Sequence, residues 1–170
     1  TEDNRVRKLD YSIQLSALFY QRFIDNEKIT LFSPHDVAGL YDSFGTESFD
    51  DLYKQYELDE SIPKTQVDAQ ELILDLLKER AETGRLYLMN IDHCNSHSSF
   101  IDKVEMSNLC QEITLPTKPI QHIDDKTGEI ALCILSAINV GKIRDLSDLE
   151  VLCDLAVRSL DELIDFQQYP

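Results

Sequence analysis

The chain has 170 residues, of which 32 are acidic and 16 are basic, so its formal net charge is −16 at pH 7. Its composition, 42% hydrophobic and 28% charged, is typical of a globular chain with a sizeable core, and the length favours one domain. Because nucleic acids and anionic membranes attract basic patches, the acidic balance argues against non-specific binding to either. A small anionic substrate stays compatible, since helix N-termini and a few arginines hold phosphate.

Targeting signals and cysteine usage indicate the compartment. The first ten residues, TEDNRVRKLD, have no apolar core of a signal peptide, and no apolar run approaches the length of a membrane span. Cys94, Cys110, Cys133 and Cys153 are widely spaced, without a C-x-x-C pair. We therefore expect reduced thiols and a cytoplasmic location.

Two helices are predicted at the start of the chain. Residues 6–27 carry apolar side chains at roughly helical spacing, which predicts the first helix. In the segment TLFSPHDVAGLYDSF, Ser33 is a good cap, Pro34 fits a first turn, and Asp36 favours the positive end of a helix dipole. We expect the second helix to begin there.

Two more helices are predicted before the middle of the chain. An acidic, tyrosine-bearing helix is expected from Phe49 to about Leu58. The segment TQVDAQELILDLLKERAETG has the strongest helical pattern, with Thr65 and Asp68 as a cap-like start and Gly84 as a natural stop.

The second half is predicted to contain three strands and a final helix. The expected strands are RLYLMNI, SNLCQEITLPTKP and, after the turn-like DDKTGE, the run IALCILSAIN, which is apolar on both faces as in a buried strand. The helix is LSDLEVLCDLAVRSLDELIDF, with Ser147 and Glu150 as a capping box. The order of elements predicts an α/β fold. Three strands are few for a sheet interior, so we expect a part of a larger fold.

The segment SNLCQEITLPTKP carries the most chemical interest. If it is extended, the side chains of Asn108, Cys110 and Glu112 point to the same face. A neighbouring carboxylate disfavours a thiolate, so the thiol stays protonated. A protonated thiol beside a base and an amide suits hydrogen-atom exchange, with Glu112 handling protons and Asn108 holding a hydroxyl. From spacing alone, a strand edge with incidental polar residues stays open as the alternative.

The other cysteines have simpler interpretations. Cys133 and Cys153 lie among apolar residues, where a cysteine packs as a small hydrophobic side chain. Cys94 has His93 and His97 nearby, but three ligands without a second cluster make an incomplete metal site. We expect no metal there and a strand-end loop with hydrogen-bonded histidines.

Five segments in order resemble a known family: NRVRKLDYSIQL, ITLFSPHDVAGLYDSF, GRLYLMNIDHCNSHSSF, SNLCQEITLPTKP and GEIALCILSAINVG. Together they resemble the central part of the large (α) subunit of aerobic class I ribonucleoside-diphosphate reductase, of the bacterial and phage type. The resemblance implies an α/β fold that is part of a ten-stranded α/β barrel, in its helix-rich N-terminal half. Residues 1–170 would be a fragment of one catalytic barrel domain: 1–84 mainly helical, 85–139 strands and finger loop, 145–166 helix.

The resemblance also implies site residues. Cys110 would be the thiyl-radical cysteine that removes the 3′ hydrogen of the ribose, Glu112 the base for the 3′-hydroxyl, and Asn108 a hydrogen-bond partner of the ribose hydroxyls. Cys133 would be one half of the redox-active disulfide. The implied substrate-binding residues are Asn108, Leu109, Cys110, Gln111, Glu112 and Leu135.

The implied activity is reduction of ribonucleoside diphosphates for DNA precursor synthesis, in an oxidoreductase that acts on CH or CH2 groups with a disulfide as acceptor. The implied partners are a radical-generating small (β) subunit that contains a metal, thioredoxin or glutaredoxin, ATP and dNTP effectors, and the remaining segments of the large subunit. The family's other redox cysteine and its radical-transfer tyrosines have no match in these residues. We therefore expect an isolated chain that binds no cofactor, is inactive, and self-associates through open strand edges.

Two rival functions remain. A self-contained thiol oxidoreductase would form a disulfide between Cys110 and Cys133 and exchange it with small thiols. A non-catalytic interaction module derived from the reductase would bind companion segments and would tolerate replacement of Cys110.

Overall fold

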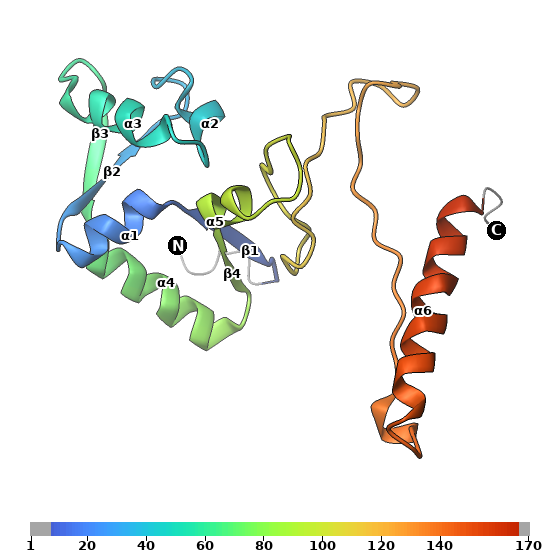
Figure 1. Ribbon diagram of the computed structural model, residues 1–170. Helices are drawn as coiled ribbons and strands as arrows, with labels where there is room; N and C mark the ends of the chain where they lie inside the picture. The colour runs from blue at the N-terminus through green and yellow to red at the C-terminus, as the bar shows by residue number, and fades with distance from the viewer. Residues whose placement is uncertain (1–7, 167–170) are drawn as a thin grey trace. The chain divides into compact units, whose positions relative to one another are not determined.

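The computed structural model describes residues 8–166 and divides into two compact units, the first ending at Ile130 and the second beginning at Ala131 (Figure 1). The positions of the two units relative to one another are not determined, so each is described by itself. In chain order the first unit contains β1 (Tyr11–Leu15), α1 (Ala17–Ile24), β2 (Lys28–Phe32), α2 (Leu40–Ser43), α3 (Phe49–Leu58), β3 (Lys64–Asp68), α4 (Ala69–Thr83), β4 (Leu86–Asn90) and α5 (Ile91–Ser96). The second contains the 3-10 helix η2 (Val140–Lys142) and α6 (Asp148–Asp165).

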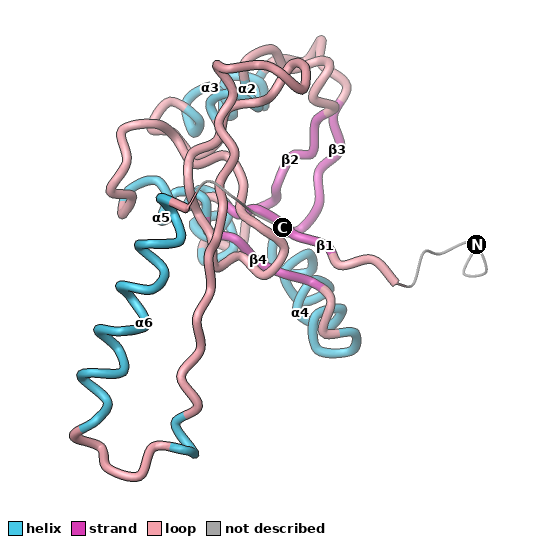
Figure 2. Tube along the Cα trace, turned by 90° about the vertical axis from the view of Figure 1, so that its right-hand side faces the viewer, coloured by secondary structure: helices cyan, strands magenta, loops and turns pink. Residues whose placement is uncertain are grey.

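The strands form two separate pairs. β1 and β4 are parallel, with Tyr11 opposite Leu86, whereas β2 and β3 are antiparallel, with Lys28 opposite Asp68. Parallel strands need a crossover, and here it runs through everything from α1 to α4 (Figure 2). Within residues 8–166 the fold is mixed α/β, and its strands close no sheet.

The core of the first unit has three buried clusters. The first joins β1, α1, β2 and α4, the second lies around α2 and α3, and the third lies where β4 enters α5. Their fully or nearly buried members are Leu15, Phe19, Ile29, Ala69 and Ile73; Leu18, Val37, Leu40, Phe49 and Tyr53; and Met89, Ile91 and Val104. In the part of the chain that the structure describes, no helix combines the length and the apolar character that a membrane span needs.

The helix predicted over residues 6–27 is wrong in its first half. Residues 11–15 form β1, and the helix begins only after Ser16, whose hydroxyl accepts a hydrogen bond from the Phe19 backbone N–H at 3.3 Å. Tyr11, Ile13 and Leu15 fit both a helical and an alternating pattern, and pairing with β4 decides between them.

The caps predicted at Ser33 and Thr65 are also wrong. Residues 34–36 form a turn, and α2 starts only after Gly39, whose φ of 76° no right-handed helix can contain. Thr65 lies in β3, so Asp68 alone caps α4, where its carboxylate accepts hydrogen bonds from the N–H groups of Gln70 and Glu71. The helix predicted at 49–58 is confirmed as α3, and the helix predicted to stop at Gly84 is confirmed as α4. The strand predicted in RLYLMNI is confirmed as β4.

The last two predicted strands are absent from the described structure. Residues 107–116 contain a turn, and residues 130–139 have no regular structure and are mostly exposed. A strand needs a neighbouring strand for its backbone hydrogen bonds, and among residues 8–166 neither segment belongs to a strand pair; Lys118 forms only an isolated antiparallel bridge with Glu129. The final helix is confirmed as α6, but Ser147 makes no capping bond and Cys153 is exposed rather than packed in a core.

A polar network lies beside the second cluster. The Arg22 guanidinium donates two hydrogen bonds to the Glu57 carboxylate, and the two side chains are only 15% and 13% exposed. The Thr30 hydroxyl donates to the same carboxylate at 2.7 Å. The Tyr53 hydroxyl accepts from the Thr30 N–H at 2.7 Å and donates to the Thr30 carbonyl at 2.8 Å. This network joins α1, β2 and α3.

Replacing Glu57 by glutamine should destabilise the chain. The change removes the mostly buried carboxylate that faces Arg22 and leaves that guanidinium only the more exposed Glu27, 3.2 Å from Arg22 Nε, which costs about 2 kcal/mol of unfolding free energy. Urea unfolding followed by circular dichroism measures this loss. The matched control is Glu129→Gln, which breaks the half-exposed ion pair with Lys118 and should leave the midpoint near that of the wild type. Equal midpoints for the two variants would contradict the role given to the network.

Candidate functional site

The segment that carries Cys110 is a tight turn, which corrects the extended form expected for it. The Asn108 carbonyl accepts a hydrogen bond from the Gln111 N–H at 3.1 Å, and the Asn108 N–H donates to the Ile113 carbonyl at 3.3 Å. The Asn108 side-chain oxygen accepts from the Ile113 N–H at 2.9 Å. These three bonds close a loop with Leu109 and Cys110 at its tip. The alternating pattern of an extended strand therefore does not apply to Asn108, Cys110 and Glu112.

The backbone of this turn adopts an unusual conformation at Gln111. Its φ is 67°, in the left-handed region that a residue with a side chain enters at a cost of about 1 kcal/mol. The Gln111 side-chain amide donates a hydrogen bond to the Ser12 hydroxyl on β1 at 2.6 Å. The turn is thus joined to a strand 99 residues earlier in the chain.

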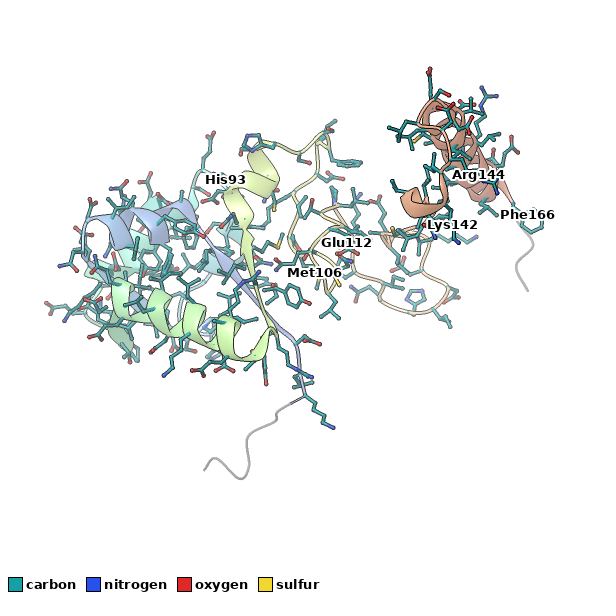
Figure 3. The ribbon with its side chains drawn as sticks, turned by 90° about the horizontal axis from the view of Figure 1, so that it is seen from below. His93, Met106, Glu112, Lys142, Arg144 and Phe166 are labelled. Carbon is teal, nitrogen blue, oxygen red and sulfur yellow. The ribbon has the colours of Figure 1, made fainter. Side chains whose placement is uncertain are left out.

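Two more amide side chains hold the segment that leads into the turn. The Gln14 amide on β1 donates to the Glu105 carbonyl at 2.8 Å. Asn95 of α5 donates to the Val104 carbonyl at 3.0 Å and accepts from the Val104 N–H at 2.8 Å. Val104 itself is fully buried. Figure 3 labels Met106 and Glu112 on this loop and His93 on α5.

The groups in the turn differ in accessibility. Cys110 and Glu112 are exposed, Leu109 is 59% exposed, and Asn108 and Gln111 are half-buried. A thiol and a carboxylate two residues apart are therefore both accessible on one short loop, while the amide of Asn108 fixes its shape. Such a loop can present a hydrogen-atom donor and a base to the same substrate.

The remaining predicted residues lie elsewhere. Cys133 and Leu135 belong to the second unit, and both are exposed. All four cysteines are free thiols. The structure thus brings Asn108, Leu109, Cys110, Gln111 and Glu112 together, and it leaves the position of Cys133 relative to Cys110 undetermined.

Beside the loop lies a cavity of about 560 Å³. Its walls come from β4, from α5 and the turn after it, and from Gln111 and Thr114 of the loop. Residues 91–96 form α5 rather than the expected strand-end loop, and His97 at its end is hydrogen-bonded as expected, with Nδ1 lying 3.1 Å from the His93 carbonyl and 3.1 Å from the Ser96 hydroxyl. Among residues 8–166, no group of three or more His, Cys, Asp or Glu side chains is arranged to hold a metal ion.

Sequence reasoning missed the residues that hold the loop. Ser12, Gln14 and Asn95 are polar residues without any motif, and two of them lie in a segment that was predicted as helix. The alternation of polar Ser12 and Gln14 with apolar Ile13 and Leu15 is the signal that could have revealed a strand with one polar face.

Comparison with known proteins gives a consistent result. The family model described as "Ribonucleotide reductase, barrel domain" matches residues 1–170. The chain is 58% identical over 174 aligned positions to the ribonucleoside-diphosphate reductase subunit alpha of Haemophilus influenzae, covering 99% of this chain and 23% of that protein. It is 55% identical to ribonucleoside-diphosphate reductase 1 subunit alpha of Escherichia coli, over 70% of this chain and 16% of that protein. It is 40% identical to the ribonucleoside-diphosphate reductase subunit alpha of Enterobacteria phage T4, over 99% of this chain and 23% of that protein.

The four thiols should differ in reactivity. Burial raises the pKa of the Cys94 thiol, so less of it is thiolate at neutral pH. We expect iodoacetamide at pH 7.5 to alkylate Cys94 roughly three- to tenfold more slowly than the exposed Cys110. Peptide mass spectrometry over a time course measures the four rates. In 6 M urea the rates should converge. A Cys94 that reacts as fast as Cys110 in the folded chain would contradict the burial assigned to it.

Proposed function

Because the chain belongs to the ribonucleotide reductase barrel-domain family, we propose that it provides the radical-bearing loop of a ribonucleoside-diphosphate reductase α subunit. The observation that carries the proposal is the closed turn that presents Cys110 and Glu112 together. Hydrogen bonds from Asn108 to Gln111 and Ile113 close this turn. The substrate is a ribonucleoside diphosphate, and the product is the deoxyribonucleoside diphosphate used for DNA precursor synthesis.

In this proposal Cys110 exchanges a hydrogen atom with the substrate. Once oxidised to a thiyl radical, its sulfur takes the 3′ hydrogen atom from the ribose, forming an S–H bond and leaving the radical on C3′. Glu112 accepts the proton of the 3′-hydroxyl while one thiol of the redox dithiol protonates the 2′-hydroxyl, which leaves as water. The dithiol then supplies a hydrogen atom to C2′ and an electron as it becomes a disulfide, Glu112 returns its proton to the 3′ oxygen, and the radical lies again on C3′. At the end of the reaction the Cys110 S–H returns its hydrogen atom to C3′, and the radical is restored on sulfur.

Asn108 would have two roles. Its side-chain oxygen already accepts a hydrogen bond from Ile113, which leaves the two N–H donors of the amide for a ribose hydroxyl. Leu109 and Gln111 flank the reacting thiol, and Leu135 would line the same substrate pocket. Cys133 would be one half of the dithiol that supplies two electrons and becomes a disulfide, which thioredoxin or glutaredoxin then reduces.

The remaining parts of the enzyme lie outside these residues. The chain spans about a quarter of the length of the curated relatives it matches. We propose that the other segments provide the second redox cysteine, most phosphate contacts and the sites for ATP and dNTP effectors. A small β subunit that contains a metal would supply the oxidising radical. The assembly would work in the cytoplasm.

Replacing Cys110 by alanine in a full-length subunit that carries this sequence should abolish CDP reduction. Without the sulfur, no group on this loop can take the 3′ hydrogen, so turnover should fall by on the order of a thousandfold or more. The assay contains the small subunit, thioredoxin and its reductase. Cys153→Ala, at an exposed position on α6, is the control and should keep its activity. An active and folded Cys110→Ala variant would refute the proposal and favour the interaction-module alternative.

The isolated 170 residues should show no CDP reduction, even with the small subunit and thioredoxin present. The proposed chemistry needs a second redox cysteine and phosphate contacts that we assign to other segments. Each strand of the two described pairs also has one edge without a partner strand, so we expect the isolated chain to self-associate. Multi-angle light scattering measures the oligomeric state. Measurable turnover would contradict the first expectation, and a strict monomer the second.

A further inference from the structure

We propose that Ser12 is a positioning residue, which holds the reacting loop in place through the side chain of Gln111. This inference rests on the proposed function, because it concerns how the Cys110 sulfur is placed. It also changes the interpretation of Gln111, which the family resemblance presents as a substrate contact. In the structure the Gln111 amide is bound to Ser12 Oγ at 2.6 Å.

The backbone conformation of Gln111 calls for a compensating contact. At a φ of 67°, a glycine would fit without steric strain, and asparagine is the next most tolerant residue. Glutamine gains nothing from this conformation unless its side chain makes a compensating contact. The hydrogen bond to Ser12 is such a contact, and a glycine could not make it.

Ser12, to which Gln111 is bound, lies on a rigid element. Ser12 lies within β1, directly opposite Tyr87 in the parallel pair with β4. The same strand ends at Leu15, which is buried in the first core cluster. A hydroxyl in the middle of a paired strand has a fixed position, whereas the turn bonds within the loop define its shape but not where its tip lies.

A second contact to the loop comes from the same face of β1. Side chains two residues apart on a strand share a face, so Ser12 and Gln14 point the same way. Gln14 holds the Glu105 carbonyl before the turn, and Ser12 holds Gln111 within it. Two points of attachment restrict both the position and the rotation of the loop. A loop held this way presents the Cys110 sulfur to C3′ in one orientation.

The test uses a full-length subunit that carries this sequence, assayed for CDP reduction with the small subunit and thioredoxin. Ser12→Ala and Gln111→Leu should each lower kcat by on the order of tenfold, because a misplaced sulfur slows hydrogen transfer, while KM for CDP stays within about twofold. The double variant should be no slower than either single one, since both remove the same bond. Ser12→Thr keeps the hydroxyl and should restore kcat.

Gln111→Gly separates the side-chain contact from the backbone shape. Glycine keeps the left-handed turn without strain but loses the bond to Ser12, so kcat should still fall. Gln121→Leu, at an exposed glutamine outside the loop, is the control and should leave kcat and KM unchanged. Thermal melting of every variant checks that the fold is intact. The alkylation rate of Cys110 gives a readout besides turnover, and it should rise when the tether is lost.

The outcomes distinguish the two levels of the proposal. An inactive wild type, or an active Cys110→Ala variant, overturns the proposed function itself. If wild type is active and Cys110→Ala is not, an unchanged kcat in Ser12→Ala overturns the tether alone. A raised KM in Gln111→Leu with Ser12→Ala unaffected also overturns it, and assigns Gln111 to the substrate.

Discussion

The parallel pairing of β1 with β4 is the contact on which the described part of the site depends. It places Leu15 in the core and brings Asn90, at the end of β4, opposite it. From there α5 begins, and its Asp92 carboxylate accepts a hydrogen bond from the Ala17 N–H at the start of α1. The same strand pair therefore fixes where α1 and α5 begin, and β1 offers the polar side chains that hold the loop.

β1 has two faces with different functions. Leu15 is buried in the first core cluster and Ile13 packs against it, whereas Ser12 and Gln14 bind the loop through hydrogen bonds. A strand that is apolar on one face and polar on the other is ordinarily half-exposed to solvent. Here part of the polar face serves a neighbouring segment of the chain instead. The five residues of β1 thus contribute both to the hydrophobic core and to the hydrogen bonds that hold the loop.

How far the sequence alone predicts this molecule depends on how local each signal is. α4 was predictable because its signals lie within it: Asp68 caps it, Gly84 ends it at a φ of 65°, and the pattern between them is helical. β1 was not, since Ile13 and Leu15 fit two periods and only a strand about 75 residues away decides between them. Gln111 was assigned by position in a motif, but its left-handed backbone and its bond to Ser12 depend on the fold. Cys110 and Glu112 were found by motif, and their roles stay predictions.

The segment from Ile130 to Asn139 is a case in which the local sequence pattern predicts a strand that the described structure does not contain. It has the apolar composition of a strand buried on both faces, yet it has no regular structure and Leu132 is 81% exposed. A segment becomes a strand only when a neighbouring strand pairs with its backbone. An apolar composition therefore indicates that the segment suits a buried strand, but it does not supply the partner. The chain matches only about a quarter of the length of relatives such as the subunit alpha of Haemophilus influenzae.

The separation in sequence between the two paired strands has a consequence for synthesis of the protein. β1 emerges from the ribosome long before β4, and the loop follows β4 by about twenty residues. Until β4 is available, β1 lacks the parallel partner that it has in the described residues, and the position of Ser12 is not yet set by that pair. Long-range pairings of this kind form late, because the intervening chain must first be ordered. The thiol is thus placed only after the folding of the crossover, which delays its presentation until the surrounding structure exists.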